Sequence, residues 1–317
     1  MGAFSLPTWL VALTWSIVGL ASLGTIMGGF AHRGWLFDLA SHFRWQYAWL
    51  LGAGVVVLLL AQQWPGAVAA AGMMCLNLRA IMPTRAAASS VARSGQRTTR
   101  ALLLNVLWTN RSHERVTRLI REMKPDFGVL VEIGTDWIAA LRELETAYAF
   151  TKVVMHTEHF GFFFFSRVPV ERLEVIRLRA TSLPSLWACV RINETRLTVI
   201  ATHPHSPKSP LRTRWRNQEL HALAEFVRQH PPTPLMVLGD LNTTPWIPAF
   251  QQLIRKTRLH DSRNGFGNQP TWPVLVPLLG IPVDHCLVSP EIIVTKRSVG
   301  PSVGSDHYPV IIDFSIE

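Results

Sequence analysis

The sequence predicts an α/β domain with mixed sheets covered by helices, preceded by an N-terminal membrane anchor. Three observations support this prediction. No charged residue occurs between Met1 and Ala31. From Ala101 onward, short apolar runs alternate with segments of helical periodicity. Two strand-like runs flank Asn193-Glu194-Thr195, which is a hairpin signal. Hairpins combined with crossover helices favour mixed or mainly antiparallel sheets with helices outside.

The N-terminal region carries the expected anchor. Residues 7–30 are uncharged and mostly apolar, which is long enough to cross a hydrocarbon core of ~30 Å. No basic stretch precedes this segment and no small-residue cleavage site follows it, so a retained helix is favoured over a signal peptide. Two further apolar runs, 45–63 and 64–82, predict about three transmembrane helices, with two helices plus an interfacial segment as the alternative.

The net charge of +10 divides unevenly along the chain. Residues 1–100 hold seven Arg and one Asp, whereas residues 101–317 hold 24 Lys plus Arg against 20 Asp plus Glu. Residues 83–100 therefore read as an Arg-rich juxtamembrane linker that lies near lipid headgroups. The modest +4 of the remainder is poor support for a large nucleic-acid footprint. The three cysteines are odd in number and far apart, so no disulfide framework follows from them.

The part from Ala101 is expected to be the catalytic domain, and its elements follow from the local pattern. Strands are predicted where apolar runs are short, and helices where apolar residues recur every three or four positions. The expected strands are 101–107, 127–133, 162–165, 186–192, 196–201, 235–238, 286–289 and 308–314, and the expected helices are 112–124, 136–147 and 211–229.

Polar side chains that suit phosphoryl chemistry follow several of these strands. Gly239-Asp240-Leu241-Asn242 ends the apolar run 235–238, and its spacing places Asp240 and Asn242 on one side of an extended segment. The segments with such residues, in chain order, are Leu104-Asn105-Val106, Val131-Glu132, Thr202-His203, Gly239-Asp240-Leu241-Asn242, Val283-Asp284 and Ser305-Asp306-His307.

That ordered set resembles the endonuclease/exonuclease/phosphatase superfamily, the deoxyribonuclease I-like enzymes, over roughly residues 101–317. The membrane-anchored bacterial members, such as the teicoplanin-resistance phosphatases, are similar in overall plan. The resemblance implies a four-layer α/β sandwich of two packed sheets with helices outside. It also implies a phosphoric ester hydrolase that depends on Mg²⁺, with Mn²⁺ as a substitute.

The resemblance also implies roles for individual residues. Glu132 is the expected metal ligand, with Asn105 and Asp306 assisting, because hard cations prefer carboxylate and amide oxygens. His307 is the expected base or phosphate partner, oriented by Asp284. The remaining catalytic and substrate-binding residues are expected to be Asp240 for the attacking water, Asn242 and His203 for phosphate, and Arg167 for substrate. Some superfamily members carry an acidic ligand where this chain has Leu107, so a second carboxylate at that position is not expected.

The sequence is thus interpreted as a membrane-anchored, divalent-metal-dependent phosphoesterase acting on a phosphate ester or pyrophosphate, with lipid-linked phosphates among its candidate substrates. The expected partners are the lipid bilayer and that substrate. A metal-dependent nuclease is the alternative, and a non-catalytic scaffold is disfavoured by the complete residue set. The apolar loop 275–281 before Asp284 suits either a lipid tail or the core.

The expected location is the bacterial inner membrane, as a multi-pass protein. The positive-inside rule places the catalytic domain in the cytoplasm, because the Arg-rich segments lie on its side. The resemblance to the membrane-anchored phosphatases instead implies a catalytic domain outside the cytoplasm.

Overall fold

The computed structural model describes residues 6–82, 98–179, 183–230 and 234–317. The expected linker at 83–100 therefore lies almost wholly outside the described residues. Contacts divide the chain into two compact units, one of Met1–Arg85 with Thr244–Pro248 and one of Ala86–Thr243 with Ala249–Glu317.

The first unit is helical. Its elements are α1 (Thr8–Gly29), η1 (Ala31–Arg33), α2 (Trp35–Ser41), α3 (Arg44–Leu60) and α4 (Trp64–Ile81). Val18, Leu51 and Leu58 pack in its core. A buried polar contact joins the helices, because Asn77 Nδ2 donates to Thr25 Oγ1 at 2.7 Å and Arg44 Nη1 donates to Asn77 Oδ1 at 3.2 Å.

The expectation of three membrane-spanning helices is not supported. Within the described residues, α1 is the one helix long and apolar enough to cross a membrane, and the pair α2 and α3, bent by 62°, would count as a second if it acted as one span. Alone, α3 has 17 residues and spans about 26 Å, short of a hydrocarbon core of ~30 Å. The polar Asn77 and Arg79 lower the apolar character of α4. A multi-pass location therefore lacks support.

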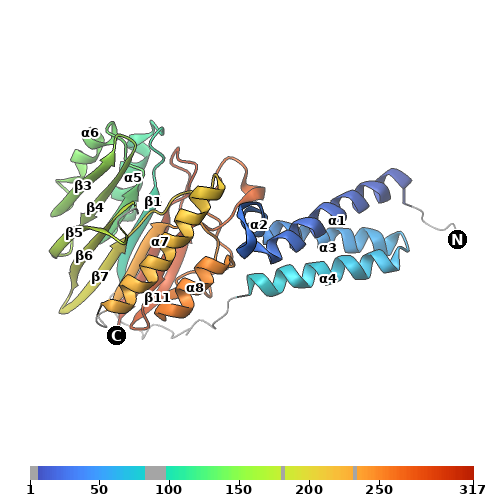
Figure 1. The fold of residues 1–317 in the computed structure, drawn as a ribbon. Coiled ribbons are helices and arrows are strands. Elements are labelled where there is room, and N and C mark those ends of the chain that lie inside the picture. Colours follow the sequence, from blue (N-terminus) through green and yellow to red (C-terminus); the bar gives the residue numbers. More distant parts are fainter. Residues whose placement is uncertain (1–5, 83–97, 180–182, 231–233) are drawn as a thin grey trace. The chain divides into compact units, whose positions relative to one another are not determined.

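Two six-stranded mixed sheets form the second unit (Figure 1). The first has the order β11-β12-β1-β2-β4-β3 and the second the order β5-β6-β7-β8-β10-β9. The strands of the first sheet are β1 (Thr99–Asn105), β2 (Phe127–Val131), β3 (Phe150–Thr157), β4 (Phe160–Ser166), β11 (Ile292–Val299) and β12 (Val310–Ile316). Those of the second are β5 (Val170–Arg177), β6 (Pro184–Ile192), β7 (Thr195–Ala201), β8 (Leu235–Asp240), β9 (His260–Asp261) and β10 (Asp284–Val288).

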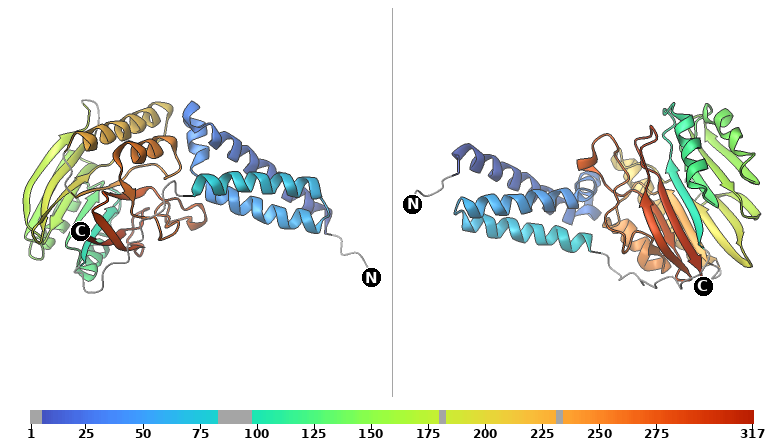
Figure 2. Two further views of the ribbon diagram at one scale, coloured as in Figure 1. Left: turned by 90° about the horizontal axis from the view of Figure 1, so that it is seen from below. Right: turned by 180° about the vertical axis from the view of Figure 1, so that it is seen from behind.

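Three apolar clusters hold these strands and helices together in four layers. The central cluster joins the facing sides of the two sheets, with Leu103 and Phe164 from one and Val199 and Met236 from the other. The second cluster joins the outer side of the first sheet to α5 (His113–Met123) and α6 (Trp137–Leu141). The third joins the outer side of the second sheet to α7 (Pro210–Gln229) and α8 (Pro248–Thr257). Figure 2 shows these helices outside the two sheets, as the four-layer expectation requires.

Most expected strands and helices appear within a few residues of their predicted limits. Sequence reasoning missed β3, β5, β9, β11 and α8 and made the helix at 136–147 too long, because that segment is α6 followed by the turn η2 (Arg142–Leu144). Strand β5 lies at the edge of its sheet and exposes five of its eight residues, so it lacks the apolar alternation of a half-buried strand.

Candidate active site

Strand register brings the predicted polar segments to one end of the sandwich. β1 and β2 are parallel with Asn105 opposite Val131, so Asn105 and Glu132 leave neighbouring strands at the same edge. β7 and β8 are also parallel, with Ala201 opposite Leu238, which places His203 level with Asp240.

The two remaining segments enter strands at that same end. β10 runs antiparallel to β8 with Asp284 opposite Asp240. β12 runs antiparallel to β1 with Val310 opposite Leu103, so the residues before Val310 lie beside the end of β1. Ser305 Oγ confirms this placement by donating to Asn105 O at 2.7 Å.

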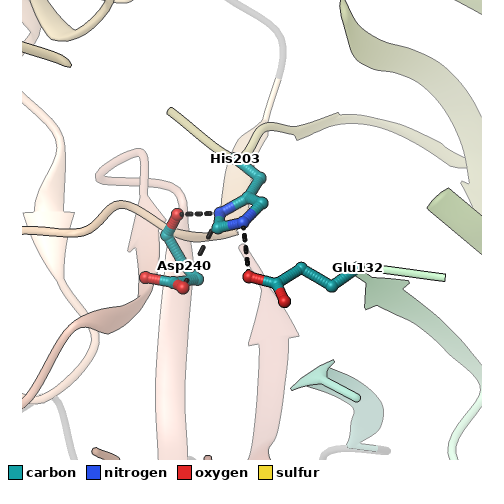
Figure 3. A group of neighbouring side chains, drawn as sticks. All are labelled: Glu132, His203 and Asp240. Atoms are coloured by element: carbon teal, nitrogen blue, oxygen red, sulfur yellow. Dashed lines mark hydrogen bonds and ion pairs between the residues drawn. The ribbon is translucent and has the colours of Figure 1, made fainter. Parts of the chain in front are cut away.

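Glu132, His203 and Asp240 form the first part of the cluster (Figure 3). The ring nitrogen Nε2 of His203 lies 3.1 Å from Glu132 Oε1, and its Nδ1 lies 2.9 Å from the backbone oxygen of Asp240. The His203 ring also stacks on Phe160, with centroids 5.1 Å apart. Glu132 has a positive φ of 58°, a rare conformation for a residue with a Cβ and one that recurs at functional sites.

Asn105 supports this group differently from the prediction. Its Oδ1 accepts the backbone N–H of Leu107 at 3.0 Å, which fixes the orientation of the amide because that N–H can only donate. Its Nδ2 donates to Glu132 Oε1 at 2.9 Å and to Asp240 Oδ2 at 3.0 Å. Asn105 thus presents N–H groups to the carboxylates and positions them. The assignment of Asn105 as a metal ligand stays a prediction, in which its Oδ1 would be the ligand atom.

His307, Asp284 and Asp240 form the second part. His307 Nδ1 lies 2.8 Å from Asp284 Oδ2, and His307 Nε2 lies 3.7 Å from Asp240 Oδ2. All three side chains are buried. The bond to Asp284 holds the imidazole so that its Nε2 faces Asp240.

Asp306 lies beside this pair. Its Oδ2 accepts a hydrogen bond from Trp272 Nε1 at 3.0 Å, while its Oδ1 is buried without a hydrogen-bond partner among the described residues and lies 3.9 Å from His307 Nε2. A buried carboxylate oxygen without a donor is the kind of atom that a cation or a bound water satisfies.

Asn242 follows β8 in a left-handed conformation with φ of 51°. Its backbone N–H donates to Asp240 Oδ1 at 2.9 Å, and its Nδ2 donates to Pro204 O at 3.0 Å, which ties it to the loop after His203. The fully buried Arg216 of α7 donates from Nη1 to Asn242 O at 3.0 Å. Asn242 therefore sits at the rim of the cluster, beside Asp240.

The cluster carries opposite charges in close contact. Burial alone would raise the pKa of Glu132, but the hydrogen bond and the charge of His203 outweigh it and lower the pKa to about 2. Burial alone would lower the pKa of both imidazoles. Asp240 and Glu132 instead raise the pKa of His203 to about 9, and Asp284 and Asp240 raise the pKa of His307 to about 10. Burial, with Asp284 nearby, raises the pKa of Asp240. The site therefore attracts positive charge and contains one carboxyl suited to accept a proton.

The donor set fits a hard divalent cation. Two groups, Glu132 with His203 and Asp240, and Asp240 with Asp284 and His307, bring one ligand atom from each residue within 4.8 Å of one another. Both nitrogens of His203 already contact oxygens, so carboxylates are the available ligands, and these favour Mg²⁺ or Mn²⁺. The side chain of Glu132 is 23% exposed, against 2% for Asp240, which makes Glu132 the accessible ligand.

Arg167 does not join this cluster, which corrects its assignment to substrate binding. Arg167 comes directly after Ser166, the last residue of β4, and Ser166 pairs with Phe127 at the start of β2. Glu132 comes directly after the last residue of β2, so Arg167 and Glu132 lie at opposite ends of these strands. Its guanidinium lies over the Tyr148 ring, 4.7 Å from the centroid, and donates to backbone oxygens of Ala147 and Lys124.

Sequence reasoning overlooked the residues that hold the functional ones. Trp272 binds Asp306, Arg216 binds the carbonyl of Asn242, and Thr271 Oγ1 accepts from the backbone N–H of Asp284 at 3.2 Å. These contacts join segments that are distant in the sequence, so no local pattern predicts them.

Comparison with known proteins agrees with this geometry. Residues 102–307 match the profile of the endonuclease/exonuclease/phosphatase family. No curated protein sequence is significantly similar to the chain.

Several solved structures share the fold. A protein of that family from Bacteroides vulgatus has 17% identity and a TM-score of 0.59 over 70% of this chain and 100% of its own. One from Beutenbergia cavernae has 20% identity and a TM-score of 0.58 over 70% and 72%. Danio rerio TDP2, complexed with a single-strand DNA product, has 14% identity and a TM-score of 0.57 over 69% and 99%. Identities this low show the fold alone.

Proposed function

The chain belongs to the endonuclease/exonuclease/phosphatase family, and from this premise we propose that it is a divalent-metal-dependent phosphoester hydrolase. One observation carries the proposal. His307, oriented by Asp284 at 2.8 Å, faces Asp240 at 3.7 Å, beside the accessible carboxylate Glu132. A phosphoester hydrolase needs these parts: a proton acceptor for water, a cationic partner for the phosphoryl oxygens, and ligands for a hard cation.

Each residue has a role that its contacts support. Asp240, held by Asn105 and the backbone N–H of Asn242, accepts a proton from the water whose oxygen attacks phosphorus. His307, kept protonated by Asp284, offers its Nε2–H to a phosphoryl oxygen as the bond to the leaving oxygen breaks. His203, kept protonated by Asp240 and Glu132, adds a second positive charge at the wall of the site.

The cation is proposed to be Mg²⁺, with Mn²⁺ as a substitute. Glu132 would hold it, with Asp306 nearby because its buried Oδ1 lacks a hydrogen-bond partner among the described residues. A bound divalent cation supplies stabilisation of charge on the phosphoryl and leaving oxygens.

The test is hydrolysis of a chromogenic phosphodiester and a phosphomonoester by the purified full chain, with Mg²⁺ or with EDTA. We expect one of the two to be hydrolysed only with the divalent ion. His307→Ala should lower that activity at least ~10²-fold, and the solvent-exposed control Glu194→Ala should leave it unchanged. Equal rates in EDTA and Mg²⁺, or a His307→Ala protein as active as the wild type, would refute the proposal.

A nuclease is the second candidate function, because Danio rerio TDP2 carries a DNA product on the same fold. Fluorescent single- and double-stranded oligonucleotides in the same assay decide between the two. Cleavage of oligonucleotides faster than of small phosphoesters would favour the nuclease.

We further propose that α1 anchors the enzyme to a membrane, since it is 22 residues long and carries no charged side chain. A C-terminal reporter that is active in only one compartment determines on which side the catalytic unit lies. Release of the protein from membranes by alkaline carbonate, or removal of residues 1–30 from the mature chain, would contradict the anchor.

A further inference from the structure

The exposed apolar side chains of the catalytic unit gather around the site. The most exposed lie in one loop, where Leu275 is 87% and Leu278 is 89% exposed, with Val276 and Leu279 also exposed. Outside the connections that surround the site, Val175 on the edge strand β5 is the one exposed large apolar side chain among the described residues of this unit.

The stem of this loop, residues 271–281, contacts the catalytic segment directly. Trp272 Nε1 donates to Asp306 Oδ2, the backbone N–H of Val274 donates to Asp306 O at 2.9 Å, and the N–H of Tyr308 donates to Thr271 O at 2.8 Å. Trp272 and Ile281 form a bridge that closes the stem. The apolar tip therefore extends from the wall of the active site on a hydrogen-bonded support.

A second connection adds exposed apolar and basic side chains. The loop after His203 leads into α7, whose first two turns expose Leu211 and Trp215. The exposed Arg212 and Arg214 alternate with them, and residues 203–218 contain no acidic residue. Trp215 lies against the ring of His205, with centroids 4.9 Å apart.

A third connection contributes Trp108, which follows Asn105 by three residues, is 38% exposed and stacks on His159 at 4.0 Å. Tryptophan, leucine and arginine side by side on an exposed surface are the composition of protein segments that lie in the interfacial region of a lipid bilayer. Exposed apolar groups of this number are unusual on a surface that meets only water.

We propose that this rim, made of Trp108, Leu211, Trp215 and residues 275–279, inserts into the interfacial region of an anionic lipid bilayer. The proposal rests on the proposed phosphoesterase function and specifies its substrate class as an amphiphilic phosphate presented at a lipid surface. The apolar helix α1 supports a lipid occupant, because the membrane anchor proposed for it would keep the catalytic unit next to a bilayer. The arginines on α7 supply the complement to anionic headgroups.

Two experiments on the full chain test this proposal. The first measures docking without hydrolysis. An NBD fluorophore is attached to a cysteine at Leu278→Cys. The control is Glu194→Cys, in the turn before β7, at the end of this strand away from the active site. Both variants carry Cys75→Ser and Cys189→Ser and retain the buried Cys286. In nanodiscs of phosphatidylglycerol and phosphatidylethanolamine, brominated acyl chains should quench the probe at 278 and leave the probe at 194 unquenched.

The second measures substrate choice. The substrates are a pair of phosphodiesters, hexadecyl 4-nitrophenyl phosphate and methyl 4-nitrophenyl phosphate. If the enzyme is a monoesterase, the pair is hexadecyl phosphate and methyl phosphate. The two members of each pair share a phosphoryl group and differ only in the length of the alkyl tail. Leu275→Ser/Leu278→Ser should lower kcat/KM for the hexadecyl compound in vesicles about tenfold or more, and change the methyl compound less than about twofold. Val175→Ser should change neither.

The outcomes separate the two claims. If the wild type hydrolyses none of these compounds, the proposed function fails, while the quenching still decides the docking. An unquenched probe at 278 would overturn the lipid docking. Equal losses on both tails would also overturn the proposal, since the loop would then act only by holding Asp306.

Discussion

The bond between His307 and Asp284 offers the sharpest test of the site. His307→Ala removes the imidazole that faces Asp240, and it should lower the rate at least ~10²-fold, the scale of general acid–base groups. Asp284→Asn keeps the imidazole but replaces the negative partner 2.8 Å from Nδ1 with a neutral amide. It should therefore cost less than His307→Ala.

The double variant is decisive because Asp284 is proposed to act through His307. Asp284 Oδ2 contacts His307 Nδ1, and Asp284 is fully buried. Once the imidazole is gone, Asp284 has no further catalytic role, so Asp284→Asn/His307→Ala should be no more than about threefold slower than His307→Ala alone. Independent residues would instead give the product of the two single losses.

The assay is the steady-state rate on the phosphoester that the wild type hydrolyses, at saturating Mg²⁺. Circular dichroism and thermal unfolding of each variant confirm that the fold is retained, which we expect because both residues lie at strand ends. Multiplicative losses in a folded double variant would refute the dyad, and Glu194→Ala serves as the matched surface control.

Three further predictions follow from other contacts. Glu132→Gln removes the accessible anionic ligand and should raise the Mg²⁺ concentration for half-maximal activity about tenfold or more, so an unchanged Mg²⁺ titration would exclude Glu132 as a ligand. A fragment of residues 98–317 should remain folded and hydrolyse a small soluble phosphoester, because all of it except Thr244–Pro248 belongs to one compact unit. Aggregation of the fragment would contradict this. Burial lowers the pKa of His285 to about 4 from an ordinary 6.5. Between these two pH values the unfolded chain binds a proton at His285 that the folded chain does not bind. The free energy of unfolding should therefore fall by up to ~3 kcal/mol as the pH drops through that range. Urea unfolding of the fragment measures this, and His285→Gln should flatten the dependence; a slope unchanged by the substitution would show that other groups cause it.

Most buried strands and three of the outer helices could be predicted from local apolar patterns, whereas the arrangement in two packed sheets was expected only from the family resemblance. Runs such as Phe127–Val131 and Leu235–Leu238 are wholly buried, so their apolar composition marks them as strands. Edge strands such as β3 and β5 were missed, since one side faces water and their sequences mix charged and apolar residues. The membrane-spanning helices were overcounted because an uncharged apolar run indicates only that a segment avoids water. A segment that spans a membrane must also form one continuous helix of about 20 residues.

The sequence by itself determined which residues are candidates for the chemistry. Glu132, His203, Asp240, Asp284, Asp306 and His307 stand at strand ends or within four residues of them, and their order along the chain indicated the family. Strand ends are readable because apolar runs stop there, and polar side chains that follow them reach a common edge.

Only the tertiary structure decided how those residues meet. It turned the amide nitrogen of Asn105 toward the carboxylates, placed Arg167 at the far end of β4, and joined Trp272 to Asp306. These outcomes depend on strand register and on side-chain hydrogen bonds between segments as far as 200 residues apart, as for Ser305 and Asn105. A one-dimensional pattern reports which side chains leave a strand, and the packing of two sheets determines which of them come within bonding distance.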